Sequence, residues 1–320
     1  MPTHRTVEVN GLHLHIAEEG EGPLVLLLHG FPEFWYSWRH QLSALAEAGY
    51  HAVAPDQRGY GSSDRPESVE AYSILHLAGD VIGLIHALGE RDAVVVGHDW
   101  GSLVAWSTAT LRPDAVRGVA GLSVLPAPGR GPVPPLRQTR EQFEGRFYWN
   151  YFEQPGVAEA EFSKDVDRTF RRLLYGASGD RPLDGPAGPP LVPPGGGFLD
   201  LAADPGQLPP WLTEEDLAAY VAAFEGSGFT GGLNWYRNLD RNWELTAAWD
   251  RARIEMPALF VVGDRDRAFP GHDKIVAALS NAAPHHREPV IVPGAGHWVQ
   301  QERPAAVSSA LVAFLSSLTR

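Results

Sequence analysis

The residues with the clearest chemical potential are two aspartates and a histidine, each placed after a predicted strand. Asp99 lies in Gly97-His98-Asp99-Trp100-Gly101, between a β-branched run and an apolar helical pattern. A strand, a sharp turn and a helix, with glycine two residues either side of the exposed position, are typical of a nucleophile elbow. Because a carboxylate occupies that position, the sequence predicts displacement at a saturated carbon and an ester joined to the enzyme.

A carboxylate nucleophile needs a base that activates water to release the product, and the base needs an orienting acid. His297 directly follows the last predicted strand, and Asp264 and Asp266 follow the strand before it. We assign Asp266 as the acid, because it lies further out in its loop and can reach an imidazole. A turn, a helix cap or a packed histidine would explain each residue alone. Together, in the order nucleophile, acid, histidine at strand ends, they predict a catalytic triad.

Two backbone N–H groups are the expected oxyanion-hole donors. Phe31 lies in His29-Gly30-Phe31-Pro32 after the third predicted strand, and Trp100 follows the nucleophile. A tight turn is the simpler explanation of the first motif, and both explanations are compatible because the turn aims the N–H. We expect these donors to keep Asp99 ionised and then to stabilise the oxyanion formed when water attacks the ester. His98 is expected to be packed rather than catalytic.

The elements that must position these residues follow a pattern of apolar strands and helices. Alternation about Asn10-Gly11 predicts an antiparallel hairpin over residues 6–17. Continuous apolar strands with helices between them indicate an α/β fold, a mostly parallel sheet with helices on both faces. The strands are expected at 24–28, 50–54, 93–96, 117–124, 258–262 and 290–292, and the helices at 37–48, 72–88, 102–111, 274–279 and 304–318.

A helical insertion interrupts this alternation. Residues 141–175 and 213–249 are helical in pattern and dense in aromatic side chains, whereas Gly176–Pro210 between them is rich in proline and glycine. A loop of this length is usually functional or mobile, and whether it gates the site is left open. We divide the chain into a first core part at 1–125, a helical cap at 126–246 and a second core part at 247–320.

Composition excludes several classes of partner and site. The chain has 320 residues and a formal net charge of -13, which argues against nucleic acid or an anionic membrane as a partner. It has no cysteine, so disulfides, thiolate nucleophiles and cysteine metal sites are excluded. Met1–Arg5 lacks an apolar signal core and the apolar runs are strand-length, so we expect a soluble, cytoplasmic protein. Only Lys164 and Lys274 are lysines, as in proteins from G+C-rich bacteria.

The chain resembles the soluble epoxide hydrolases of the α/β-hydrolase fold over essentially its full length. Core motifs carry part of the resemblance, at residues 29–33, 55–61, 97–102, 263–266 and 294–298, and dehalogenases share most of them. The cap segments Tyr151–Glu161 and Gly228–Trp243 are more specific to epoxide hydrolases. The resemblance implies an inserted helical cap, a small apolar epoxide and water as reactants, a vicinal diol as product, and no metal or organic cofactor.

The resemblance also implies two cap tyrosines whose hydroxyls hold and protonate the epoxide oxygen. They fall on Tyr236, in Asn234-Trp235-Tyr236-Arg237, and on Tyr148, with Tyr151 as the alternative for the first of the pair. An alkoxide is a poor leaving group at neutral pH, and a tyrosine can supply the acid that it needs. The substrate is expected to contact an apolar set of residues: Phe31, Trp100, Trp149, Trp235 and Trp298.

The main alternative is a haloalkane or haloacid dehalogenase that uses the same Asp99. Trp100 could donate to a halide, but haloalkane enzymes commonly have Asn where Phe31 stands, and haloacid enzymes carry arginines just after the nucleophile. A serine esterase is disfavoured because Ser102 lies inside the predicted helix. A binding protein with a degenerate hydrolase fold would usually lack a member of the triad. Monomer and homodimer both remain open.

Overall fold

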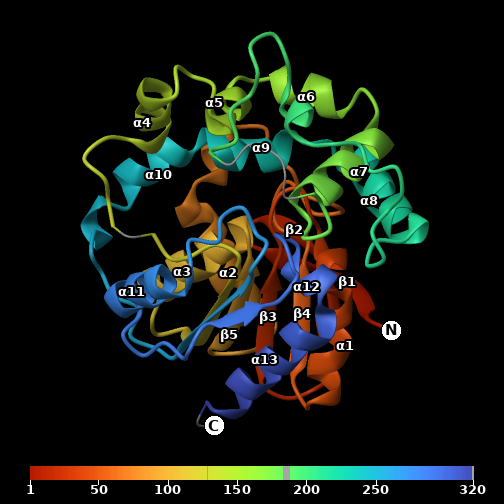
Figure 1. Cartoon of the computed structure of the whole chain (residues 1–320). Coiled ribbons are helices and arrows are strands. Elements are labelled where there is room, and N and C mark those ends of the chain that lie inside the picture. The colour runs from red at the N-terminus through yellow and green to blue at the C-terminus, as the bar shows by residue number, and fades with distance from the viewer. Residues whose placement is uncertain (128, 183–187, 319–320) are drawn as a thin grey trace.

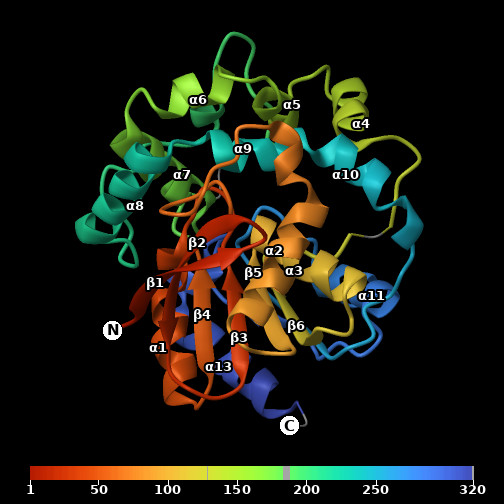
Figure 2. The same cartoon turned by 180° about the vertical axis from the view of Figure 1, so that it is seen from behind.

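The computed structural model describes residues 1–127, 129–182 and 188–318 and contains one eight-stranded sheet (Figures 1 and 2). The strand order is β1-β2-β4-β3-β5-β6-β7-β8. The strands are β1 (Thr3–Val9), β2 (Leu12–Glu19), β3 (Leu24–Leu28), β4 (His51–Pro55), β5 (Ala93–His98), β6 (Val116–Leu122), β7 (Ala258–Gly263) and β8 (Val290–Val292).

The predicted hairpin and the mostly parallel sheet are both confirmed. β1 and β2 pair antiparallel about Asn10 and Gly11, whose φ angles of 53° and 78° suit a type I′ turn. β2 also pairs antiparallel with β4, and all the remaining pairs in the sheet are parallel. Every residue of β3 and β5 is buried, as expected for strands covered on both faces.

Helices cover both faces of the sheet, and each face has its own apolar core. In Figure 2, α2 and α3 lie in front of the sheet, on the face that is turned away from the viewer in Figure 1. In Figure 1, α13 lies in front of the sheet, on the opposite face. The first face carries α2 (Ile74–Ala87), α3 (Trp100–Leu111) and α11 (His272–Ala282). The second face carries α1 (Arg39–Glu47), α12 (Val299–Glu302) and α13 (Pro304–Ser316).

The helical insertion lies between β6 and β7 in the chain and forms a layer above the sheet in both views (Figures 1 and 2). Its helices are α4 (Pro135–Gln142), α5 (Tyr148–Glu153), α6 (Val157–Phe162), α7 (Val166–Ala177), α8 (Glu214–Ser227), α9 (Thr230–Arg237) and α10 (Leu239–Leu245). The 3₁₀ turns η3 (Phe198–Leu201) and η4 (Ala247–Trp249) also lie between β6 and β7, whereas η1 (Trp35–Trp38) and η2 (Val69–Tyr72) lie earlier in the chain. The domain boundaries at 125/126 and 246/247 stay predictions.

The stretch predicted as helical over 141–175 is broken into short helices. Gly145 and Gly156 have φ angles of 72° and 82°, which end one helix and begin the next. The predicted loop 176–210 has little regular structure apart from η3, and residues 183–187 of it lie outside the described residues. Glu161 of α6 holds the start of η3 in this loop, because its carboxylate accepts the backbone N–H groups of Phe198 and Leu199, both at 2.9 Å.

The pairing register brings the carboxyl ends of the parallel strands to one edge. Leu28 pairs with Gly97, His98 pairs with Leu122, and Gly263 pairs with Val292. The loops that follow β3, β5, β7 and β8 therefore start next to one another, beneath the cap. These four loops carry the predicted oxyanion donor, nucleophile, acid and base.

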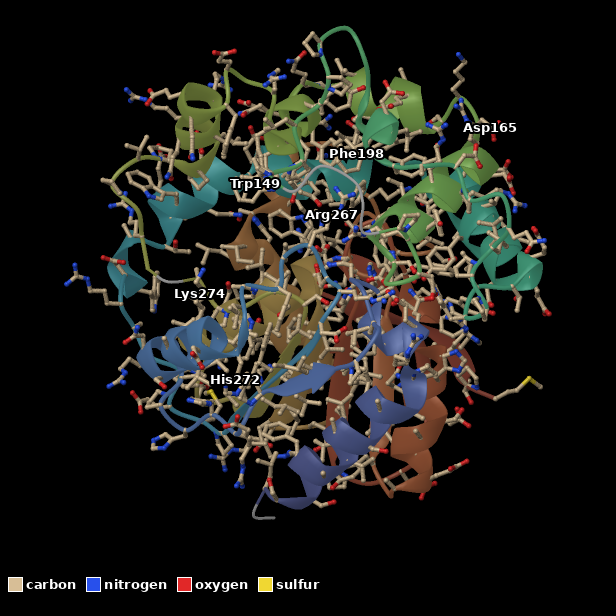
Figure 3. All side chains as sticks on the ribbon, viewed as in Figure 1. Trp149, Asp165, Phe198, Arg267, His272 and Lys274 are labelled. Carbon is tan, nitrogen blue, oxygen red and sulfur yellow. The ribbon has the colours of Figure 1, made fainter. Side chains whose placement is uncertain are left out.

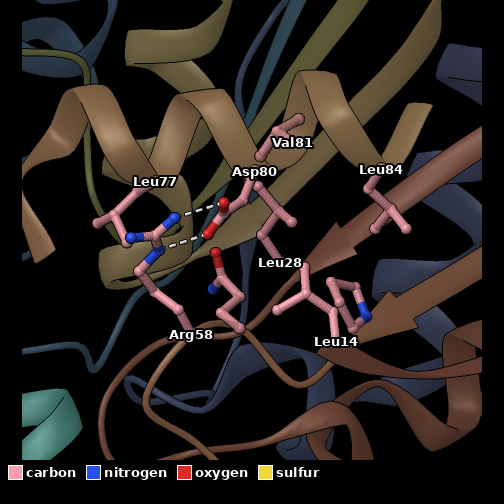
Figure 4. A pocket seen from close by; sticks show the side chains of 9 residues that line it. Leu14, Leu28, Arg58, Leu77, Asp80, Val81 and Leu84 are labelled. Atoms are coloured by element: carbon pink, nitrogen blue, oxygen red, sulfur yellow. Dashed lines mark hydrogen bonds and ion pairs between the residues drawn. The ribbon is translucent and has the colours of Figure 1, made fainter. Parts of the chain in front are cut away.

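A small internal cavity lies under α2, apart from these loops (Figure 4). Its volume is about 10 Å³, the lower limit for one water molecule. The buried pair Arg58 and Asp80 lines it, with Arg58 Nε 2.5 Å from Asp80 Oδ2. The other lining residues are Leu14, Leu28, Pro55, Gln57, Leu77, Val81 and Leu84. None of the predicted site residues lines this cavity, so it is not the substrate site.

Across 1–127, 129–182 and 188–318, no helix has the length and apolar character needed to cross a membrane.

Candidate active site

Asp99 occupies a strained backbone position at the junction of β5 and α3. Its φ and ψ are 52° and -119°, a region that non-glycine residues rarely adopt. The turn is possible because the chain segments around it touch: a Cβ on Gly97 would overlap Gly101 O, and one on Gly101 would overlap Leu28 O. Strain of this kind persists only where the surrounding packing enforces it. The sharp turn presents the Asp99 carboxylate at the carboxyl end of β5.

The Asp99 carboxylate is held by one backbone donor and the predicted base. Phe31 N donates to Oδ1 at 2.9 Å, and His297 Nε2 lies 3.5 Å from Oδ2. Burial alone would raise the pKa of Asp99, but the hydrogen bond and charge of His297, together with the Phe31 N–H, lower it below its usual value. The side chain is 17% exposed, so an ionised carboxylate remains accessible to a small molecule.

His297 lies between two carboxylates. Its Nδ1 is 3.0 Å from Oδ2 of Asp266, and Oδ1 of Asp266 accepts the Ala268 N–H at 2.8 Å. Burial lowers the pKa of His297, but Asp266 and then Asp99 raise it well above its ordinary value. For Asp266 burial acts in the opposite direction and raises the pKa, but the charge of His297 outweighs burial, and the pKa of Asp266 is lowered. The two carboxylates thus shift the equilibrium of the imidazole towards its protonated form.

Two cap tyrosines meet above the carboxylate. Tyr148 begins α5 and Tyr236 lies in α9, and their ring centroids are 5.9 Å apart. The Tyr236 ring is edge-on to Trp100 at 5.0 Å and to Phe31 at 5.5 Å. Burial, followed by the negative charge of Asp99, raises the pKa of both phenols. Tyr151 points elsewhere, because its hydroxyl donates to Glu161 at 2.9 Å.

Comparison with known proteins places this geometry in a family. A protein-family profile described as alpha/beta hydrolase fold matches residues 23–186. Epoxide hydrolase A of Mycobacterium tuberculosis is 48% identical over 323 residues, which cover 99% of this chain and 98% of that protein. The chain belongs to the epoxide hydrolases of the α/β-hydrolase fold. It is therefore a hydrolase whose reactants are an epoxide and water.

Other epoxide hydrolases also match this chain over nearly the full length of both chains. Epoxide hydrolase 3 of Siraitia grosvenorii is 42% identical, over 98% of both chains. The solved structure of an epoxide hydrolase from an endophytic Streptomyces has a TM-score of 0.92 at 45% identity, covering 99% of this chain and 96% of that one. Epoxide hydrolase A from Mycobacterium thermoresistibile gives a TM-score of 0.89 at 48% identity, over 100% and 99%. The cap and the core are thus shared with solved epoxide hydrolases along their length.

In this epoxide hydrolase the remaining predicted residues lie around the predicted triad and the two cap tyrosines. Trp235 is fully buried, edge-on to Trp100 at 5.9 Å, while Trp149 packs against Tyr148 at 6.0 Å. Trp298 lies against His297 at 4.9 Å, and its indole N–H donates to Leu174 O in the cap. Figure 3 shows Trp149 and Phe198 in the cap and Arg267 below them, towards the sheet. Substrate contact by these tryptophans stays a prediction.

The second oxyanion donor also stays a prediction. Among the described residues, Phe31 is the one whose backbone N–H donates to the Asp99 carboxylate. Within the described parts of the chain, the Trp100 N–H forms no hydrogen bond with that carboxylate.

Sequence reasoning missed a buried pair beneath the predicted triad of this epoxide hydrolase. His98 Nδ1 is 2.7 Å from Glu33 Oε2, and both side chains are completely buried. His98 Nε2 lies 2.8 Å from the backbone O of His297, which also accepts the Ser123 hydroxyl at 2.8 Å. His98 is packed, as predicted, and it also supports the backbone of the predicted base, His297. The only signal in the sequence was a glutamate in an otherwise apolar motif, Phe31–Phe34.

Proposed function

We propose that this epoxide hydrolase converts small apolar epoxides to vicinal diols through an alkyl ester on Asp99. Tyr148 and Tyr236 hold and protonate the epoxide oxygen, and His297, oriented by Asp266, activates the water. The observation that carries the proposal is that the imidazole contacts the Asp99 carboxylate while both cap phenols, packed against each other, lie close enough for its charge to raise their pKa.

Ring opening is the first step. An Asp99 oxygen attacks a ring carbon and forms a C–O bond, while the bond from that carbon to the epoxide oxygen breaks. The oxygen takes a proton from a cap phenol, which leaves a phenolate and a hydroxyalkyl ester. Tyr236 is buried and Tyr148 is half-buried against the apolar core, so an apolar ring can be held beside both phenols.

Ester hydrolysis is the second step. His297 takes a proton from water, and the resulting hydroxide attacks the carbonyl carbon of the Asp99 ester. The oxyanion is stabilised by the Phe31 N–H and by the predicted Trp100 N–H. The intermediate collapses, the bond to the alkyl oxygen breaks, and that oxygen takes the proton from His297. The proton released as the carboxylate re-forms restores the tyrosine.

The charge of Asp99 links the two steps. It raises the pKa of both phenols and, with Asp266, the pKa of His297. Alkylation of Asp99 removes this charge. The phenolate is then no longer disfavoured by a neighbouring anion, and the imidazole loses one of the carboxylates that keep it protonated. Formation of the ester therefore prepares the base for the step that follows.

Substitution of the cap tyrosines tests the assignment of the acid. Tyr236→Phe and Tyr148→Phe are each expected to lower kcat/KM for an epoxide by about 10²-fold, because each removes an O–H that donates in the transition state. A haloalkane or a nitrophenyl ester, assayed beside the epoxide, needs no such proton. Tyr151→Phe is the matched control and is expected to stay near wild type, since that hydroxyl bonds to Glu161.

Unchanged epoxide kinetics in both substituted enzymes would refute the role of these tyrosines. Faster turnover of the haloalkane than of the epoxide would instead favour the dehalogenase alternative for the same Asp99.

Substitution of Asp266, the proposed orienting acid, is expected to change the pH dependence of ester hydrolysis. Asp266 raises the pKa of His297, so Asp266→Asn lowers that pKa. The base acts as neutral imidazole, and the acidic limb of ester hydrolysis is therefore expected to move to lower pH. The plateau rate should fall by about 10³-fold to 10⁴-fold, because the imidazole loses its orienting partner. Single-turnover hydrolysis rates measured against pH check both effects.

The neighbouring carboxylate offers a control. Asp264 is exposed and accepts the Gly294 N–H at 2.7 Å, so Asp264→Asn is expected to leave the pH profile in place. A shift of the Asp266→Asn limb to higher pH would contradict the assignment.

A further inference from the structure

The carboxylate of Glu302, at the end of α12, collects three backbone N–H groups. Oε2 accepts from Gly179 at 2.8 Å and from Gly296 at 2.9 Å, and Oε1 accepts from Trp298 at 3.1 Å. Gly296 and Trp298 are the two neighbours of His297 in the chain, whereas Gly179 lies just beyond the end of α7 in the cap. One side chain thus connects both flanks of the base to the cap.

The carboxylate is satisfied by amides rather than by a cation. Glu302 is only 3% exposed, and among the described residues no Arg, Lys or His side chain forms an ion pair with it. Arg303 donates instead to the backbone O atoms of Glu302 and Gly294. Burial raises the pKa of Glu302, and the three N–H groups oppose that rise. A buried carboxylate is tolerated where hydrogen bonds of this kind compensate for lost water.

The two segments that Glu302 joins are also in direct backbone contact. A Cβ on Gly296 would overlap Gly179 N, and one on Gly179 would overlap Gly294 O. His297 N donates to Ala177 O at 2.8 Å. With this packing, a change in the hydrogen bonds of Glu302 displaces the loop that carries the imidazole, and not only the cap.

We propose that Glu302 is a positioning residue for ester hydrolysis, because it fixes the backbone on both sides of His297 against the cap. This inference rests on the proposed role of His297 as the base. Under that mechanism Asp99 attacks the epoxide without help from His297, so displacement of the imidazole slows hydrolysis of the ester and spares its formation. A misplacement of about 1 Å can cost about 10²-fold in the rate of one chemical step.

Glu302→Gln tests the proposal with little change of shape. The amide oxygen can still accept two N–H groups, but the amide NH₂ then faces the third donor. We expect ester hydrolysis to slow by about tenfold to a hundredfold and ester formation to stay within about threefold of wild type. Rapid-quench single turnovers of an epoxide, followed by intact mass, give both rate constants. In the steady state kcat and KM should fall together, because the ester accumulates.

The two rate constants separate positioning from folding. Each is measured on folded molecules only, so a variant that merely folds poorly leaves both constants unchanged. Asp264→Asn is the matched control, since Asp264 accepts an amide N–H of the same loop but is exposed. Its two constants should stay within about twofold of wild type.

Unchanged hydrolysis in Glu302→Gln, or equal slowing of both steps, would overturn the inference. If neither the wild-type enzyme nor His297→Gln forms an ester, the proposed function on which the inference rests is overturned instead.

Discussion

Asp99→Ala is expected to lower epoxide turnover by about 10⁶-fold, because the variant has no group that can form the ester. The measurement is diol formation by purified enzyme, with thermal unfolding to confirm that the elbow still folds. Asp99→Asn keeps the size of the side chain and an oxygen for the Phe31 N–H, and it is expected to be similarly impaired. Loss of activity in both variants separates loss of the nucleophile from loss of packing.

Isotope labelling examines the same step in the wild-type enzyme. Water attacks the ester carbonyl in the proposed mechanism, so turnover in heavy-oxygen water should place the label in the Asp99 side chain. Peptide mass analysis of the segment that contains Asp99 would detect it. Direct attack of water on the epoxide would label only the diol, and an unlabelled Asp99 after many turnovers would refute the covalent mechanism. Activity of Asp99→Ala within tenfold of wild type would do the same.

His297→Gln is expected to form the ester and then to release product at least about 10⁵-fold more slowly than wild type. Glutamine cannot take the proton of the attacking water, whereas the alkylation step needs only the Asp99 carboxylate and the cap phenols. Intact protein mass after mixing with an epoxide should therefore rise by the mass of one substrate. A burst of one equivalent of consumed epoxide should accompany the adduct.

His86→Gln provides the control for this substitution. His86 is an exposed histidine of α2, remote from the triad, and its variant is expected to turn over normally without an adduct. Absence of added mass in His297→Gln, with epoxide still bound, would contradict the role of His297 as the base of the second step.

The core of the fold could be predicted from the sequence because its signals are local. Continuous apolar runs mark the buried parallel strands, and Asn10-Gly11 marks the hairpin. The order of Asp99, Asp266 and His297 along the chain is informative because parallel strands bring their carboxyl ends to one edge. The helix predicted from Ser37 begins instead as the 3₁₀ turn η1, a boundary that periodicity alone does not locate.

Other parts depend on contacts between segments that are distant in the sequence. Tyr148 and Tyr151 are three residues apart in α5, so they share one side of the helix and spacing cannot separate them. Only the packing of Tyr148 against Tyr236, and the bond from Tyr151 to Glu161, distinguishes them. The bond from Glu302 to Gly179 spans 123 residues and has no counterpart in any local pattern.

The proposed nucleophile belongs to the sheet and the proposed proton donors belong to the layer above it. Which of the two ring carbons is attacked, and which mirror-image form of an epoxide reacts faster, is then governed by the seating of one layer on the other. The contacts between α8 and the sheet domain are part of what holds that seating, with Arg39 bonded to Asp216 at 3.0 Å and Tyr220 bonded to Gln301 at 3.0 Å. We therefore expect substitutions in these contacts, which lie outside the predicted substrate site, to alter stereochemical preference.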